Sequence, residues 1–151
     1  RYCAQKTTDM CRGQAMDLNA KERNLSLDEL NLMCFYKTGI AFEVSLVIPA
    51  ILAGREEQEI EILKRFAHHA GIAFQIKDDL LDVEGNAELL GKSIGKDEEN
   101  ARSTFVSILS IDGAKREMWE HYCLAMDALN ERKWKTPFMK HLLHYIINRE
   151  S

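Results

Sequence analysis

Residues 56–83, EEQEIEILKRFAHHAGIAFQIKDDLLDV, carry the most regular pattern in the chain. Apolar side chains recur in it about every 3.6 residues, at Ile60, Leu63, Ala67, Ala70 and Phe74. This spacing places them on one face of a helix, where they can pack against a core. The pattern stops near Gly85. We therefore expect one long helix from about Glu56 to Val83.

The segments on both sides of this helix are also predicted to be helical. Ser26 and Glu29 have the spacing of a capping box that opens a helix, and Gly54 is a suitable residue to end it. A loop rich in glycine and charge follows at residues 84–101. Helices are expected at about residues 2–19, 26–54, 56–83, 112–133 and 137–149. With no strand-like alternation and no linker in the sequence, we predict an all-α fold, either one compact domain or part of a larger one.

Composition limits the classes of partner. The 151 residues carry 20 basic and 24 acidic side chains, a net charge of −4, so no broad basic surface for nucleic acid is expected. The longest apolar run, residues 40–54, is shorter than the roughly 20 residues that span a bilayer. It also contains Glu43. We predict a buried helix there and no membrane span.

The cysteines are expected to be packing residues, and the histidines are expected to be surface or packing residues. Cys3, Cys11, Cys34 and Cys123 include no C-x-x-C pair, and the sequence shows no secretory segment, so reduced thiols and a cytoplasmic location are expected. His68-His69 and the pair His141 and His144 have no acidic or cysteine partner at metal-ligand spacing.

The end of the long helix carries a polar stripe, which consists of Gln75, Asp78, Asp79 and Asp82. These residues share one helical face, where neighbouring carboxylates repel each other and the helix dipole opposes them. A solvated acidic face is one interpretation. An EF-hand is excluded because its glycine, aligned on Gly85, would put Leu80 at the first ligand position. Carboxylates without cysteine or histidine suit Mg²⁺, which shares phosphate oxygens, so a diphosphate ligand is the second interpretation.

A diphosphate ligand would also need basic residues. Lys37 and Thr38 lie in FYKTG at residues 35–39, and Lys92 and Lys96 lie in GKSIGK at residues 91–96. We expect Lys37 to face the same cavity as the polar stripe. The alternatives are a lysine that extends to solvent at Lys37 and a solvated loop at Lys92. A P-loop is rejected because its first glycine and its preceding strand are absent.

The order of four motifs resembles a known family. GQAMDL, KTG, FQIKDDLLDV and LGKSIGKD, at residues 13–18, 37–39, 74–83 and 90–97, are similar to the C-terminal half of a trans-isoprenyl diphosphate synthase, most of all to bacterial farnesyl diphosphate synthases. The resemblance covers nearly the whole chain, down to YIINR at residues 145–149. It implies the C-terminal half of an isoprenoid synthase helical bundle, with the first aspartate-rich motif of the family absent from residues 1–151.

The resemblance also implies roles for individual residues. DDLLD is similar to the second aspartate-rich motif, which holds Mg²⁺ against an allylic diphosphate. Gln14 and Asp17 would lie near the cavity in supporting roles. The implied metal ligands are Asp78, Asp79 and Asp82, the implied catalytic residues are Asp78, Lys37 and Asp82, and the implied substrate-binding residues are Lys37, Thr38, Gln75 and Lys92.

The implied activity is condensation of isopentenyl diphosphate with dimethylallyl or geranyl diphosphate to give farnesyl diphosphate, by a homodimer or larger self-assembly. The 151 residues alone are expected to be inactive. Phe35-Tyr36 replaces a basic pair frequent in the bacterial enzymes, and STFVSIL at residues 103–109 replaces TYPALL. A longer-chain geranylgeranyl or polyprenyl diphosphate synthase therefore remains an alternative. So does a non-catalytic helical subunit of a heteromeric synthase.

Overall fold

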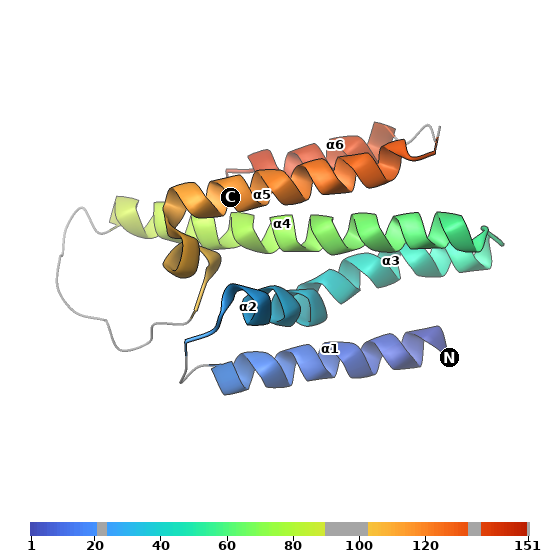
Figure 1. Ribbon diagram of the computed structural model, residues 1–151, viewed down its shortest axis with the longest axis horizontal. Helices are drawn as coiled ribbons and strands as arrows, with labels where there is room; N and C mark the ends of the chain where they lie inside the picture. The colour runs from blue at the N-terminus through green and yellow to red at the C-terminus, as the bar shows by residue number, and fades with distance from the viewer. Residues whose placement is uncertain (21–23, 90–102, 133–136, 151) are drawn as a thin grey trace.

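The computed structural model describes residues 1–20, 24–89, 103–132 and 137–150. Throughout these ranges the regular elements are helices, which confirms the predicted all-α class (Figure 1). They are α1 (Tyr2–Asn19), α2 (Leu27–Cys34), the short π-helix η2 (Phe35–Gly39), α3 (Ile40–Leu52), α4 (Glu57–Leu89), α5 (Phe105–Asn130) and α6 (Pro137–Asn148).

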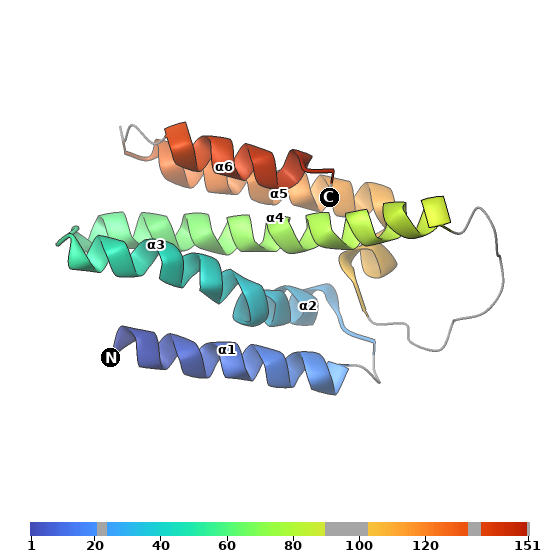
Figure 2. The same ribbon diagram turned by 180° about the vertical axis from the view of Figure 1, so that it is seen from behind.

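Helix α4 runs through the middle of the bundle. On one side it contacts η2 and α3, and on the other it contacts α5 and α6 (Figures 1 and 2). Helix α1 packs on η2 and α3 and lies furthest from α5. The buried apolar side chains of α4, among them Ile72 and Ile76, form the centre of the core. The polar stripe thus sits on the element that touches most of the others.

The segment predicted as one helix from Ser26 to Gly54 is α2, η2 and α3 joined end to end. The capping box is confirmed, because the Ser26 hydroxyl accepts from the Glu29 amide and the Glu29 carboxylate accepts from the Ser26 amide. Gly54 ends the segment with φ +67°, as expected of a C-terminal glycine. The interruption is η2, whose wider turn sets the positions of Lys37 and Thr38. Such turns recur at functional sites.

The predicted start of the fourth expected helix at Asp112 is wrong. Helix α5 begins at Phe105 and has its own capping box between Thr104 and Ser107. Ser110 is non-helical, with φ 67° and ψ 169°, so the helix bends there. Because of this break, residues 105–109 do not continue the 3.6-residue apolar period of the rest of α5, so the sequence pattern did not predict the first turn. The turn nevertheless forms, because Phe105 is fully buried in the core.

Two glycines let three elements meet at residues 37–39. A Cβ atom on Gly13 of α1 would lie 2.5 Å from the Lys37 amide nitrogen. A Cβ atom on Gly71 of α4 would lie 2.7 Å from the Cα atom of Gly39. Both obstacles are backbone atoms, so a larger residue must push the helices apart. The packing of η2 therefore depends on small residues from its two neighbours.

We expect Gly71→Ala to lower the free energy of unfolding by about 2 kcal/mol, because the added methyl group overpacks the contact with Gly39. Gly85→Ala on the same helix is the control. A Cβ atom there meets nothing within 4 Å, so alanine should raise stability by about 0.5–1 kcal/mol through its helix propensity. Urea unfolding of both variants checks the contrast. Changes of the same sign would contradict the close approach.

The continuous helical segment Leu27–Leu52 is long and apolar enough to cross a membrane by length and composition alone, a test that core helices also pass. Its most apolar window is 28% buried by the described residues. Glu43 within it is 3% exposed and binds Lys6 of α1, with Nζ and Oε1 2.9 Å apart. The Tyr2 hydroxyl also donates to this carboxylate. These contacts bury Glu43 against α1, although most of the apolar window is not buried by the described residues.

Candidate active site

The polar stripe divides into two parts. Successive residues on a helix point about 100° apart, so Asp78 and Asp79 face different neighbours. Asp78 and Asp82 line an open cavity of about 680 Å³ beside the end of α6. Gln75 and Asp79 turn instead toward η2 and the start of α5. The four residues do lie on one side of α4, as predicted, but they contact two different sets of neighbours.

Asp79 is held at the junction of three elements. Its Oδ1 accepts from Gln75 Nε2 at 3.3 Å, and its Oδ2 accepts from the Phe105 amide at 2.9 Å. Gln75 Oε1 accepts in turn from Thr38 Oγ1 at 3.4 Å. Burial raises the pKa of Asp79, while the two hydrogen bonds it accepts lower that pKa. This chain of bonds fixes the relative positions of η2, α4 and α5.

Lys37 lies on the neighbouring element η2, as predicted, but it does not line the cavity of Asp78. Its Nζ is 3.0 Å from Oδ2 of Asp17 on α1, and Asp17 is buried. The expectation that Lys37 faces the same cavity as the polar stripe stays a prediction. Asp17, predicted to have a supporting role, is the ion-pair partner of Lys37. Gln14, predicted to have a similar role, is exposed on α1.

Asp78 has a basic partner that the sequence did not single out. The Arg149 guanidinium, just beyond the last residue of α6, donates to Asp78 Oδ1. It also lies over the Phe74 ring, with its Cζ atom 4.2 Å from the ring centroid. The two partners are 71 positions apart in sequence. Arg149 lies in YIINR, but nothing local indicates which helix α6 packs against.

The cavity beside Asp78 has the donor chemistry of a hard cation site. Its acidic lining residues are Asp78, Asp82, Glu84 and Glu150, and its basic ones are Lys77 and Arg149. Oxygen donors without sulfur or imidazole fit Mg²⁺ better than zinc. Within the described ranges, no three histidine, cysteine or acidic side chains converge closely enough to enclose a metal ion. The arrangement therefore fits one open wall of a magnesium site.

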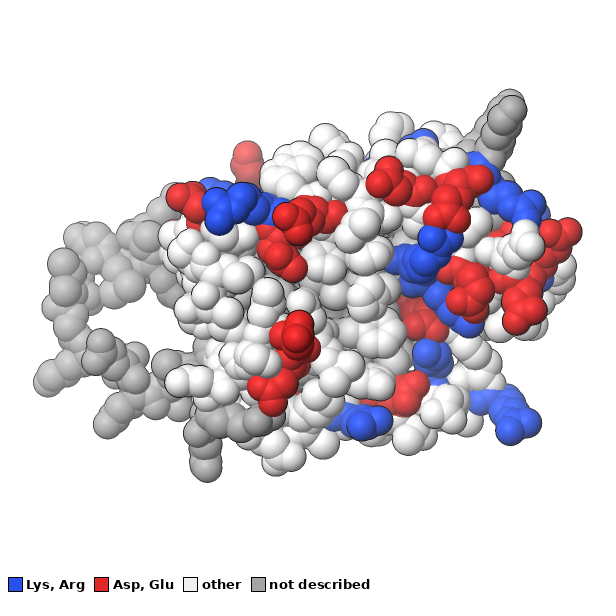
Figure 3. All heavy atoms as spheres, viewed as in Figure 1, with Lys and Arg blue, Asp and Glu red and all other residues white. Residues whose placement is uncertain are grey.

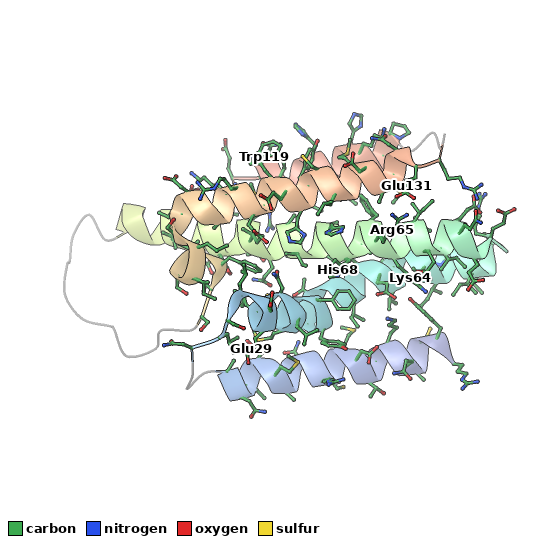
Figure 4. All side chains as sticks on the ribbon, in the orientation of Figure 1. Glu29, Lys64, Arg65, His68, Trp119 and Glu131 are labelled. Carbon is green, nitrogen blue, oxygen red and sulfur yellow. The ribbon has the colours of Figure 1, made fainter. Side chains whose placement is uncertain are left out.

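Among the described residues, the other charged side chains include no group of three histidine, cysteine or acidic residues that could hold a metal ion. Lys92 and Lys96 lie outside the described residues. Acidic and basic side chains intermingle on the face seen in Figure 3, which presents no broad basic surface. Figure 4 shows Arg65 of α4 and Glu131, just beyond the end of α5, beside one another, and the guanidinium donates to both oxygens of that carboxylate. Neither residue lines the cavity of Asp78.

A histidine pair is packed between α4 and α5. The Nδ1 atoms of His69 and His121 are 2.9 Å apart, and His121 Nε2 is 3.5 Å from Glu117 Oε1. One Nδ1 atom donates to the other, and the tautomers of the two rings decide which. Burial, together with the positive charge of neighbouring groups, lowers the pKa of each ring to about 4. This confirms the predicted packing role for His69.

We expect acid to destabilise the fold through this pair. Between about pH 6.5 and pH 4 the two histidines are protonated in the unfolded chain but remain neutral in the folded protein. The free energy of unfolding therefore falls as the pH falls. The loss is about 3 kcal/mol for the pair after allowance for solvent screening.

Urea unfolding at pH 7, 5.5 and 4.5 tests this, with His121→Gln beside the parent. The variant should lose roughly half of the acid-dependent difference, although Glu117, His68 and Arg65 remain nearby. Superimposable pH profiles for parent and variant would contradict the assignment.

The helical bundle and its acidic wall define an isoprenoid synthase fold, and the chain belongs to the polyprenyl synthetase family, whose sequence profile matches residues 1–137. It is 42% identical over 118 residues to the farnesyl diphosphate synthase of Bacillus subtilis strain 168, covering 78% of this chain and 40% of the relative. It is 34% identical over 148 residues to the farnesyl diphosphate synthase of Micrococcus luteus, covering 98% and 51%.

A solved structure shows the same fold. The geranylgeranyl pyrophosphate synthetase from the archaeon Geoglobus acetivorans matches with a TM-score of 0.83 at 26% identity, covering 97% of this chain and 56% of that one. These findings confirm the family predicted from the four motifs. The chain spans about half the length of the curated relatives it matches.

Proposed function

We propose that the protein is a prenyltransferase that condenses isopentenyl diphosphate with dimethylallyl or geranyl diphosphate to give farnesyl diphosphate. The observation that carries this proposal is the oxygen-lined cavity of Asp78 and Asp82, set beside the linked residues Thr38, Gln75 and Asp79. Membership of the polyprenyl synthetase family supports it. Two relatives named farnesyl diphosphate synthases, at 42% and 34% identity, support this product.

In this proposal Asp78 and Asp82 hold Mg²⁺, with Asp79 as a further ligand directly or through water. Magnesium bound there supplies positive charge to the diphosphate as it leaves. Both oxygens of Asp79 already accept hydrogen bonds within the chain. Its main contribution is therefore to fix the end of α4 relative to η2 and α5, which keeps Asp78 and Asp82 in position.

Lys37 binds the oxygens of the allylic diphosphate that the metal leaves open. Asp17 anchors its ammonium group, which lowers the entropy cost of placing a flexible lysine. Thr38 and Gln75 add polar contacts at the same end. Lys92, which lies outside the described residues, is proposed to bind the diphosphate as well. The allylic C–O bond breaks with its electrons leaving on the diphosphate, the double bond of isopentenyl diphosphate attacks the cationic carbon, and the released diphosphate removes a proton. The protein contributes by holding charged and polar groups where negative charge develops on the leaving diphosphate.

A longer-chain synthase is the second candidate, favoured by the fold match to a geranylgeranyl pyrophosphate synthetase. We further propose a homodimer located in the cytoplasm. Leu18 of α1 and Leu32 of α2 are 62% and 47% exposed, and burial against a second copy would remove that apolar surface from water. All four cysteines are free of disulfide bonds, as the predicted reduced state requires. Cys3, Cys11 and Cys123 are exposed, so the predicted packing role is wrong for these three and holds for Cys34.

The test of function is product analysis with the protein translated from its complete reading frame. It is incubated with labelled isopentenyl diphosphate, geranyl diphosphate and Mg²⁺, and the products are separated by chain length. Farnesyl diphosphate formed with Mg²⁺ and not with excess chelator is expected. A product of 20 carbons or more would select the longer-chain alternative. Absence of any condensation would contradict the proposal and favour a non-catalytic subunit.

A further inference from the structure

We propose that Arg149 is an internal counter-ion that competes with magnesium for Asp78, because the guanidinium and the cation are alternative positive partners of the same carboxylate. The inference rests on the proposed function, because it takes Asp78 as a magnesium ligand. It assigns Arg149 a role in setting the magnesium concentration at which the site fills.

Arg149 contacts one of the two carboxylate oxygens of Asp78. Its guanidinium donates to Asp78 Oδ1, and the same nitrogen is 3.5 Å from the Phe74 carbonyl oxygen. The arginine side chain is 14% exposed and that of Asp78 is 37% exposed, so water screens the pair incompletely. A cation bound to the same carboxylate would lie close to the guanidinium, and the repulsion between the two positive charges makes simultaneous binding unfavourable.

The geometry also indicates that the pair can open. A guanidinium usually binds a carboxylate through two parallel hydrogen bonds, whereas only one nitrogen of Arg149 reaches Asp78. The Arg149 Nε is buried without an acceptor in the part of the chain that the structure describes. Arg149 follows the last residue of α6, and its ring partner Phe74 can retain it after the carboxylate bond breaks.

Competition predicts a specific change in cation affinity. When the competent state of a site is only partly populated, the apparent dissociation constant rises in inverse proportion to that population, so removing the competitor should tighten binding about tenfold. A lost positive charge would also raise affinity without any contact. Lys77→Gln controls for this effect, since Lys77 lines the same cavity but has no hydrogen bond or ion pair to Asp78 among the interactions of the described residues.

The experiment measures Mn²⁺ binding by electron paramagnetic resonance, with inorganic diphosphate present, in the protein translated from its complete reading frame. Arg149→Gln should bind Mn²⁺ about tenfold more tightly than the parent, Lys77→Gln at most about twofold more tightly, and Arg149→Lys should lie between the parent and Arg149→Gln. Asp78→Ala should weaken binding, and adding Arg149→Gln to Asp78→Ala should then change the affinity by at most about twofold, as Lys77→Gln does.

The outcomes separate this inference from the proposed function. Asp78-dependent Mn²⁺ binding that Arg149→Gln leaves unchanged overturns the counter-ion role alone. A parent that binds no Mn²⁺, or binds it independently of Asp78, overturns the magnesium site and this inference together. A purely structural Arg149 would lower the melting temperature in Arg149→Gln equally with and without Mn²⁺. In that case the melting-temperature gain from Mn²⁺ would match that of the parent, which also overturns the inference.

Discussion

Asp78→Ala is expected to lower kcat about a thousandfold, because weakening the magnesium contact removes several kcal/mol of stabilisation from the departing diphosphate. Steady-state kinetics at saturating Mg²⁺, with the protein translated from its complete reading frame, provides the measurement. The effect should fall on kcat more than on KM, since charge accumulates on the leaving group as the bond breaks.

The matched control is Asp127→Ala on α5, where the aspartate side chain is exposed. This variant should keep the parent kcat. Asp97, the surface aspartate that the loop sequence suggests as a control, lies outside the described residues. Parent rates for both Asp78→Ala and Asp127→Ala would show that the cavity beside α6 is not the magnesium site.

The second large effect concerns the 151 residues alone. No three metal-binding side chains converge within the described ranges, and the chain spans 40% and 51% of two farnesyl diphosphate synthases. One acidic wall is expected to hold magnesium and diphosphate too weakly to stabilise the transition state. We expect condensation at least about ten-thousandfold slower than in a complete synthase, a barrier difference of some 5 kcal/mol.

Incorporation of labelled isopentenyl diphosphate by the purified 151-residue chain, with geranyl diphosphate and Mg²⁺, tests this expectation. The Bacillus subtilis farnesyl diphosphate synthase serves as the reference. Circular dichroism of the same sample shows whether the chain is helical, so that inactivity can be separated from misfolding. Turnover close to the reference rate would show that the acidic residues of these 151 residues suffice, and would contradict the expectation that a second set of metal ligands is needed.

Local sequence signals predicted most of the helices. The limits of α1, the capping box at Ser26 and the end at Gly54 all follow from short patterns. The start of α5 did not follow, because Ser110 breaks the period and the first turn is stabilised by burial of Phe105. The π-helical turn η2 was not predictable either, since its backbone depends on contacts with α1 and α4 that no local pattern encodes.

The candidate site was predicted in its residue types but not in its contacts. Spacing alone grouped the polar stripe on one face, yet its members face two different neighbours. The distant partners of Lys37 and Asp78 are set by how α1 and α6 pack, across 20 and 71 positions of sequence. The roles of Asp78, Asp79, Asp82, Lys37, Thr38 and Gln75 stay predictions, as does that of Lys92 outside the described residues.

The central claim is that Asp78 holds magnesium against a diphosphate. A crystal structure of the protein translated from its complete reading frame, grown with Mg²⁺ and a non-reactive allylic diphosphate analogue, tests it most directly. The account predicts a magnesium ion about 2.1 Å from a carboxylate oxygen of Asp78, bridging to the diphosphate, with the Arg149 guanidinium moved off that oxygen. Magnesium and diphosphate bound elsewhere, with Arg149 still on Asp78, would contradict it.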